Sequence, residues 1–295
     1  MIHTITIPPD AQMVPLMRTY ADAIAARRRQ TALGLALGAL ALALACLGAD
    51  VDIFVFWAKL GNFSSYFYRL SKLDTGAFVW TDPTEWYWGL RRWLGQLGET
   101  LLMAYLGTAT GFVGGFVLCF LCSRNLVRSG WLRWLVRRYL EICRTVPDIV
   151  FALIFVVAFG LGPLPGVLAI AIHTTGALGK LFSEVVESID MKPVEGIAAS
   201  GGNWFERIRF AVLPQVLSNF TSYGLLRFEV NVRGATVLGF VGAGGIGEEL
   251  ITAIRKFYYA DVSAILLLVM VCVMAIDLLS EQVRHRLLAL EGARA

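Results

Sequence analysis

Charge is the property this chain has least of. Only 16% of its 295 residues are Asp, Glu, Lys or Arg, whereas a soluble globular domain carries about 25%. Mean hydropathy is high, at +0.65, and apolar residues gather in runs of roughly 20 residues, the length that crosses a bilayer as a helix. This shortage excludes an ordinary soluble domain and predicts an all-α, polytopic membrane protein.

Side-chain sets for catalysis or cofactor binding are also missing. The five cysteines include the pair Cys119 and Cys122, but no second pair or nearby His completes a metal site, so we expect neither a metal nor a disulfide. The nearest approach to a phosphate-binding P-loop, residues 176–180, is too short and lacks Ser or Thr after its Lys. No catalytic triad or carboxylate pair is recognisable. We therefore predict a non-enzymatic chain without its own cofactor, driven by a partner.

Six apolar runs are expected to span the membrane, and they cover residues 31–49, 97–121, 148–162, 165–185, 215–241 and 262–279. Glycines and prolines between the third and fourth predict a hairpin with a short outer turn. With both termini inside, the inner segments hold 16 Lys and Arg and the outer segments hold 7. Because basic residues stay on the cytoplasmic side, both termini are predicted to be cytoplasmic. The first run lacks a convincing cleavage site and is expected to be an uncleaved span.

The chain divides accordingly into segments of different character. These are a cytoplasmic amphipathic segment at 1–30, the first span at 31–49, an outer aromatic segment at 50–96, a core membrane domain at 97–282 with an inner loop at 186–214, and a cytoplasmic tail at 283–295. The outer segment mixes Trp, Tyr and Phe with charges, as helices in the headgroup layer do. A stacking platform for a ligand is the alternative. The basic stretch 124–144 predicts an amphipathic helix on the inner leaflet.

Basic residues cluster beside apolar runs. That position assigns them to membrane topology, so we expect lipid contact and no nucleic acid.

The inner loop ends in EGIAASGGNWFERIRFAVLP, residues 195–214. Small residues such as Gly201 permit close helix approach, while Trp204 and Phe205 belong to an apolar edge. Pro214 is suited to the first turn of the next helix, where its missing N–H costs little. The pattern predicts a short amphipathic helical pair that offers its apolar edge to a partner. An ordinary amphipathic connector is the alternative.

The same loop resembles the EAA loop of binding-protein-dependent ABC import permeases. Four residues stand at the spacing of that pattern, and three depart from it: Glu195, Gly201, Leu213 and Pro214 match, whereas Gly196, Ile197 and Ala211 differ. Three further strings resemble the permease subunit of phosphonate importers: RTVPDIVFALIF at 144–155, AIHTTGALGKLFSEVVE at 171–187 and RFEVNVRGATVLGFVGAGGIG at 227–247. The resemblance covers roughly the last two thirds of the chain.

This resemblance implies a type I ABC importer permease fold with about six membrane helices, located in the inner membrane. It implies a homodimer, ABC ATPase subunits that hold ATP and Mg, an external substrate-binding protein and transport by alternating access. The implied ATPase-coupling residues are Glu195, Gly201, Trp204, Phe205, Leu213 and Pro214.

The fifth apolar run contains Arg227, Glu229, Asn231 and Arg233. Ionisable groups inside a membrane are costly and usually face a bundle interior or a water-filled path. Glu229 and Arg233 can pair at i, i+4, which leaves a net positive face beside Arg227. With His173 of the fourth run, these residues are predicted to line a path for phosphonate or a related phosphorus oxyanion. Structural pairing is the alternative for the residues; phosphate, methionine or another amino acid are alternatives for the solute.

GAGGIG follows the fifth run and satisfies the GxGxxG pattern. An alternative from another class of protein is therefore a membrane-embedded enzyme that uses a nucleotide. Such a site requires a strand before the glycines. A scaffold or receptor component without transport is a further alternative. We favour a flexible turn or gate formed by Gly242, Gly244, Gly245 and Gly247.

Overall fold

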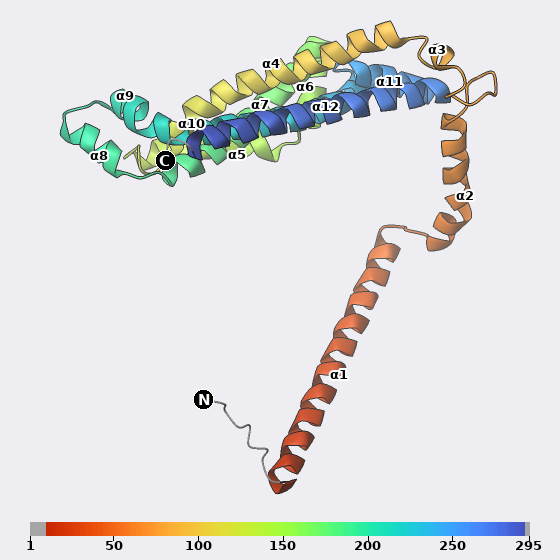
Figure 1. The fold of residues 1–295 in the computed structure, drawn as a ribbon, viewed down its shortest axis with the longest axis horizontal. Coiled ribbons are helices and arrows are strands. Elements are labelled where there is room, and N and C mark those ends of the chain that lie inside the picture. Colours follow the sequence, from red (N-terminus) through yellow and green to blue (C-terminus); the bar gives the residue numbers. More distant parts are fainter. Residues whose placement is uncertain (1–9, 293–295) are drawn as a thin grey trace. The chain divides into compact units, whose positions relative to one another are not determined.

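The computed structural model describes residues 10–292, and helices make up most of them (Figure 1). It separates into two compact units, residues 1–67 and residues 68–295, which are described in turn. Within the described residues the only β pairing is an isolated bridge between Lys72 and Phe78. The all-α fold predicted from the sequence is confirmed.

The first unit contains α1 (Asp10–Gly48) and most of α2 (Ile53–Leu70). The predicted amphipathic segment and first span are one continuous helix, since no break occurs near residue 30. Residues 1–9 of that segment lie outside the described residues. Asp52 begins α2 by accepting hydrogen bonds from the backbone N–H groups of Phe54 and Val55, at 2.8 and 3.2 Å.

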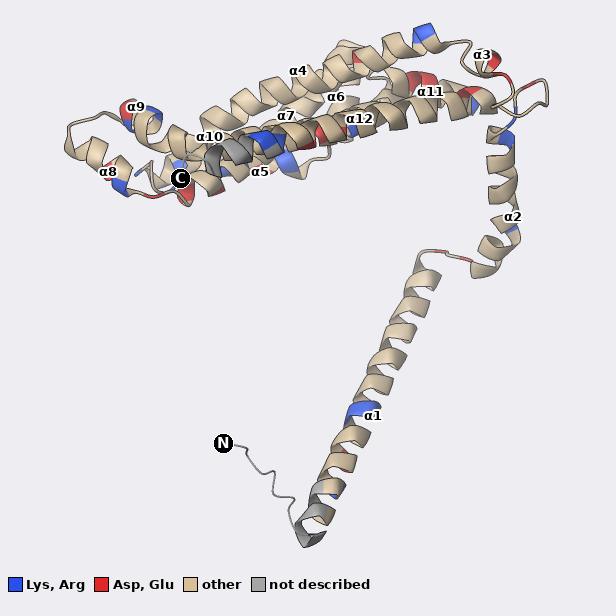
Figure 2. Ribbon diagram, viewed as in Figure 1, with Lys and Arg blue, Asp and Glu red and all other residues tan. Residues whose placement is uncertain are grey.

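The second unit is built around α4 (Leu90–Cys122), α7 (Pro163–Glu187), α10 (Leu213–Leu238) and α12 (Tyr259–Gly292), which run side by side (Figure 1). Figure 2 shows that α4 is uncharged after its first turns. Glycines let α4 and α7 approach closely: a Cβ on Gly111 would lie 2.6 Å from Thr174 Cβ. The Phe182 and Phe220 rings stack at 4.0 Å between α7 and α10.

Four helices are individually long and apolar enough to cross a membrane, and two bent pairs raise that number to six among the described residues. One pair joins α5 (Gly130–Thr145) to α6 (Asp148–Phe159) at 87°, and the other joins the helical stretch Trp204–Val241 to α11 (Ile246–Arg255) at 48°. Alone, α6 is roughly 18 Å long, shorter than the roughly 30 Å hydrocarbon core.

The basic stretch predicted to lie on the inner leaflet contributes a helix to the bundle. In α5, Leu140 is 2% exposed and fills the space opposite Gly179 of α7, where an added Cβ would come within 2.6 Å of its side chain. The predicted amphipathic helix is present, and Val136, Leu140 and Cys143 are buried against the bundle. Other apolar side chains, including Trp131 and Trp134, stay exposed. The predicted tail at 283–295 continues α12 to Gly292, and its last three residues lie outside the described residues.

Part of the outer aromatic segment also packs on protein instead of being exposed to lipid headgroups. It includes the short helix α3 (Pro83–Trp86). Trp86 Nε1 donates to Ser263 Oγ at 3.0 Å, and Trp88 Nε1 donates to Asp261 Oδ1 at 2.8 Å. Trp93 is 2% exposed. The headgroup prediction is therefore wrong for Trp93, because the start of α12 and α11 supply it with an apolar environment.

Candidate functional site

The inner loop folds as two short helices, α8 (Lys192–Ala199) and α9 (Trp204–Arg207), followed by a π-turn, η1 (Ile208–Val212), that leads into α10. Gly201 lies at the turn between α8 and α9 and has φ +86°, a left-handed backbone conformation that residues other than glycine rarely adopt. Asn203 and Glu206 form a capping box: Asn203 N donates to Glu206 Oε2 at 2.7 Å, and Glu206 N donates to Asn203 Oδ1 at 3.0 Å. The predicted helical pair is confirmed as local structure.

The predicted apolar edge of this loop splits between two directions. Trp204 is half-buried, and its Nε1 donates to the carbonyl of Leu126 at 3.3 Å. Leu213 packs against the core cluster that contains Phe220. Phe205 points outward, with 74% of its surface exposed.

The six predicted coupling residues therefore fall into two groups, one packed against the bundle and one exposed. Trp204 and Leu213 anchor the loop to the bundle, whereas Phe205 stays uncovered. Glu195, Gly201 and Pro214 are also exposed, so the rest of the described chain covers none of these four residues.

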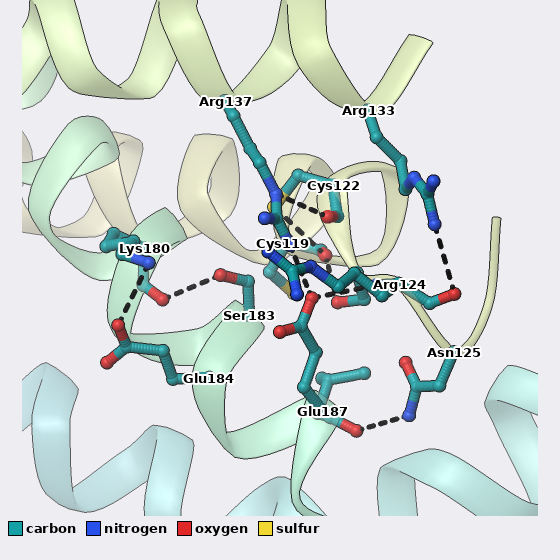
Figure 3. A network of polar contacts seen from close by, with 12 residues as sticks. Cys119, Cys122, Arg124, Asn125, Arg133, Arg137, Lys180, Ser183, Glu184 and Glu187 are labelled. Carbon is teal, nitrogen blue, oxygen red and sulfur yellow. Dashed lines mark hydrogen bonds and ion pairs between the residues drawn. The ribbon is translucent and has the colours of Figure 1, made fainter. Parts of the chain in front are cut away.

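The ends of α4 and α7 meet the middle of α5 beside the inner loop, and Figure 3 shows this network. Arg137 Nη2 of α5 lies 2.5 Å from Glu187 Oε1 at the end of α7. The Arg124 N–H, just after α4, donates to the same oxygen at 2.8 Å. Arg137 Nε donates to the Cys122 carbonyl at 3.1 Å, and Asn125 Nδ2 donates to the Val186 carbonyl at 2.7 Å. The sequence interpretation assigned these arginines to topology and missed the network, because Glu187 lies 50 and 63 residues from Arg137 and Arg124.

In the middle of the bundle, the predicted path residues separate into two groups on different faces of α10. The first group faces α7 and α4. Arg227 Nη2 contacts His173 Nδ1, and Arg227 Nε donates to Thr174 Oγ1 at 3.5 Å. Asn231, which is 4% exposed, donates to Thr108 Oγ1 at 2.8 Å and to Thr174 Oγ1 at 2.9 Å. Arg227, His173 and Asn231 are thus brought together through Thr174.

No carboxylate of the described residues comes within ion-pairing distance of Arg227, which contacts His173 and Thr174, but one acid interacts with its charge from farther away. That acid is Asp148, at the start of α6, which acts on Arg227 at longer range. Its Oδ2 lies 3.4 Å from where a Cβ on Gly234 would stand, which places it beside α10. The sequence interpretation missed Asp148, although it lies in one of the strings that carried the resemblance.

The second group faces α12. Glu229 and Arg233 pair directly, as the i, i+4 spacing predicts. Arg233 Nη2 also lies 3.6 Å from Asp277 Oδ1, and Arg284 Nη2 lies 4.0 Å from Glu229 Oε2. This group contains two acids and two bases, so its formal charge is balanced.

A pocket of about 360 Å³ adjoins His173 on α7, and Arg144 of α5 and Lys180 of α7 also line it. Lys180 pairs with Glu184 at 3.0 Å, so Arg144 adds a further positive charge. A larger pocket of about 520 Å³ between α4 and α10 has an almost wholly apolar lining that includes Tyr105, Phe112 and Phe228. The smaller pocket is the one whose chemistry suits an anion.

The glycine string does not form a nucleotide site of the GxGxxG kind. Residues 236–241, which come directly before the glycines, form the end of α10 and a 3₁₀ turn. Gly242, Gly244 and Gly245 have φ of +89°, +77° and +75°. A Cβ on Gly247 would lie 1.9 Å from the Thr236 carbonyl oxygen. The glycines therefore make a tightly packed junction, and the strand that the nucleotide reading required is a helix.

Several known proteins are similar to this chain. The phosphite transport system permease protein PtxC of Stutzerimonas stutzeri is 40% identical over 196 residues, which are 66% of this chain and 71% of that protein. The phosphate-import permease protein PhnE of Mycolicibacterium smegmatis is 40% identical over 64% of this chain, but the match spans only 36% of that longer protein. The putative cryptic phosphonate transport system permease protein PhnE2 of Escherichia coli K12 is 54% identical over 40% of this chain and 96% of that protein.

Solved structures share the fold. An inward-facing structure of the MetNI methionine ABC transporter matches with a TM-score of 0.59 at 21% identity, covering 70% of this chain and 98% of that one. A bacterial alginate ABC transporter in complex with an alginate-bound periplasmic protein matches with a TM-score of 0.54 at 13% identity, covering 85% and 94%.

The fold and the loop define a helical membrane permease of the ABC importer type. The chain belongs to the family described as the binding-protein-dependent transport system inner membrane component, whose family model matches residues 111–288. It is thus a multi-pass inner-membrane permease subunit and not an enzyme, as the sequence predicted.

Proposed function

We propose that this chain carries a phosphorus oxyanion, such as phosphonate, phosphite or phosphate, into the cytoplasm by alternating access. The observation that carries the proposal is Arg227, a half-buried arginine inside the bundle without a carboxylate in ion-pairing distance among the described residues. Its guanidinium can fork onto the oxygens of a phosphate-type anion. The relatives are named for the transport of phosphite, phosphate and phosphonate, and these anions share that chemistry.

The path would run along the α7-facing side of α10, past Arg227, His173 and Asn231, and continue to the pocket beside Arg144. Glu229 and Arg233 would contribute indirectly, since their charges satisfy each other and α12. The glycine junction at Gly242, Gly244, Gly245 and Gly247 would form the outer gate, because it lies where the bent pair of α10 and α11 changes direction.

Energy would enter through the inner loop. Phe205 and the exposed residues Glu195, Gly201 and Pro214 would dock on an ATPase subunit that holds ATP and Mg, while Trp204 and Leu213 keep the loop attached to the bundle. In this proposal the loop and both termini would lie in the cytoplasm, with a substrate-binding protein on the opposite side of the membrane.

A second copy of the chain would complete the path as a homodimer. Arg233 and Asp277 support this, because their side chains are 50% and 53% exposed on membrane helices. Lipid is a poor environment for such charges, and an identical copy brings both signs to the same patch.

Uptake by the purified importer tests the proposal. The chain would be co-purified with its ATPase, reconstituted into proteoliposomes with its binding protein, and given phosphite, a phosphonate, phosphate or methionine. We expect ATP-dependent uptake of phosphorus oxyanions and none of methionine. Uptake without an ATPase, or a preference for methionine, would contradict the proposal.

Gly201 gives a sharper test of docking. Asp and Asn both tolerate the left-handed backbone better than other side chains, so Gly201→Asn is a matched control for Gly201→Asp. If the loop docks as proposed, the aspartate should lower ATP hydrolysis and uptake well below the asparagine variant while membrane insertion stays normal. Equal behaviour of the two variants would remove this loop from the docking surface.

A further inference from the structure

One carboxylate joins the ends of α4 and α7 to the middle of α5. Glu187 Oε1, in the last residue of α7, receives Arg137 Nη2 of α5 at 2.5 Å and the Arg124 N–H at 2.8 Å (Figure 3). Arg137 reaches further, since its Nε donates to the Cys122 carbonyl at the end of α4. The Glu187–Arg137 pair therefore ties the ends of α4 and α7 to α5.

The connection between α4 and α5 is also tied to the inner loop. Asn125 Nδ2 donates to the Val186 carbonyl at 2.7 Å, next to Glu187. From the other side, Trp204 Nε1 of α9 donates to the Leu126 carbonyl at 3.3 Å. The short segment 123–129 is thus held between the end of α7 and the helix that carries the exposed Phe205.

The strength of these contacts indicates a positioning role rather than a contribution to global stability. The Arg137 and Glu187 side chains are 26% and 28% exposed, and ion pairs that water reaches add little to global stability. Their value is geometric, because one carboxylate fixes elements that lie far apart in the sequence. Arg138 and Glu141 offer a contrast: they pair at 2.6 Å within α5, and neither forms an ion pair with another helix among the described residues.

We propose that Glu187 and Arg137 are positioning residues that transmit movement of the inner loop to α4 and α5. This proposal rests on the proposed function, in which ATPase closure displaces the loop. With the network intact, α8 and α9 move together with the ends of α4, α5 and α7, so the wall of the Arg144 pocket moves with the loop. Without it, the loop moves while α5 lags behind, and ATP is hydrolysed without an equivalent movement of solute.

The test measures solute moved per ATP hydrolysed in proteoliposomes that contain the permease, its ATPase and its binding protein. For Glu187→Gln we expect normal assembly and nearly normal hydrolysis but about fivefold less solute per ATP, in the range that coupling residues show. Arg137→Gln should match it, and the double variant should be no worse than either single variant, because the two residues act as one unit. Glu141→Gln, on the same helix as Arg137, is the matched control and should leave the ratio unchanged.

A second variant guards against misfolding as an explanation. Trp204→Phe keeps the ring but removes the N–H that bonds to Leu126, so it should lower the same ratio without touching Glu187. Parallel losses of hydrolysis, uptake and assembled complex in the Glu187 and Arg137 variants would make the network merely structural and overturn the proposal. An unchanged ratio in all of these variants would also overturn it. Failure of the proposed function is distinguishable, since the unaltered importer would then show no ATP-driven oxyanion uptake.

Discussion

The two faces of α10 carry similar residues in opposite arrangements. Toward α7, Arg227 contacts His173 and Thr174, and no acid of the described residues pairs with it. Toward α12, Arg233 pairs with Glu229 and lies 3.6 Å from Asp277. Both arginines lie in the same membrane helix, six residues apart, yet only one has its charge balanced nearby.

If Arg227 lines the path as proposed, the chemistry of an arginine's partners, more than the residue type, separates a conducting face from a structural one. Two acids beside Arg233 would repel an oxyanion, whereas the hydroxyl and imidazole groups beside Arg227 leave its charge available. Burial of a charge in a membrane is costly. A sequence that keeps Arg227 incompletely compensated therefore has a use for it.

Replacing Arg227 should produce the largest effect. Arg227→Ala removes a charge-assisted contact to the oxyanion, worth about 1.5–3 kcal/mol, or roughly 10- to 100-fold in uptake. Arg227→Lys keeps the positive charge but not the two-pronged guanidinium, so its uptake should fall between that of the unaltered chain and that of Arg227→Ala. The measurement is ATP-driven uptake normalised to assembled complex. Equal losses of uptake and complex in Arg227→Ala would make this face structural as well.

Charge reversal on the other face should affect dimer formation rather than conduction. Arg233→Asp and Asp277→Arg each place like charges together within a copy and across the proposed interface, and like charges across an interface cost several kcal/mol. We expect each single variant to lose much of its dimer.

Co-expression of the two variants with different tags distinguishes contacts between copies from contacts within one copy. In the mixed dimer both contacts between copies are attractive, while both contacts within a copy remain repulsive. Recovery of mixed dimer on pull-down is the expected result. If the mixture is as poor as the single variants, the Arg233–Asp277 contact acts only within one chain.

Asn231 should give the smallest effect. Asn231→Leu removes buried hydrogen bonds to Thr108 and Thr174, and leaving such groups unsatisfied costs about 1–3 kcal/mol of stability. Uptake should fall a few-fold, together with the unfolding temperature of the detergent-solubilised complex. Thr221→Val is the matched control on α10, since its hydroxyl bonds only to the Leu217 carbonyl one turn back. A larger loss in the control would remove Asn231 from the site.

Much of this fold could be predicted from apolar run length alone. The expected spans at 97–121, 165–185 and 262–279 lie within α4, α7 and α12, because runs of about 20 apolar residues have one stable state in a bilayer. Residue spacing also predicted the Glu229–Arg233 pair and the helical inner loop.

What the sequence could not predict were contacts between distant elements. The sequence of the basic helix α5 suggested a helix on the membrane surface. Nothing in that sequence shows that Leu140 packs against Gly179 of α7. From the sequence, Trp93 was predicted to lie among lipid headgroups, but in the structure it packs against residues of α11 and α12. Likewise, no local spacing joins Arg137 to Glu187 or brings Asp148 beside α10.

Water accessibility along α10 tests the central claim most directly. Arg227→Cys and Arg233→Cys would each be exposed to a membrane-impermeant thiol reagent during ATP turnover, with the parent chain giving the background from its native cysteines. If the Arg227 side of α10 lines the path, the cysteine of Arg227→Cys should react rapidly with the reagent, and saturating phosphonate with binding protein should slow that reaction. The cysteine of Arg233→Cys should react slowly under both conditions. Rapid, phosphonate-protected reaction at Arg233→Cys with an inert Arg227→Cys would contradict the claim.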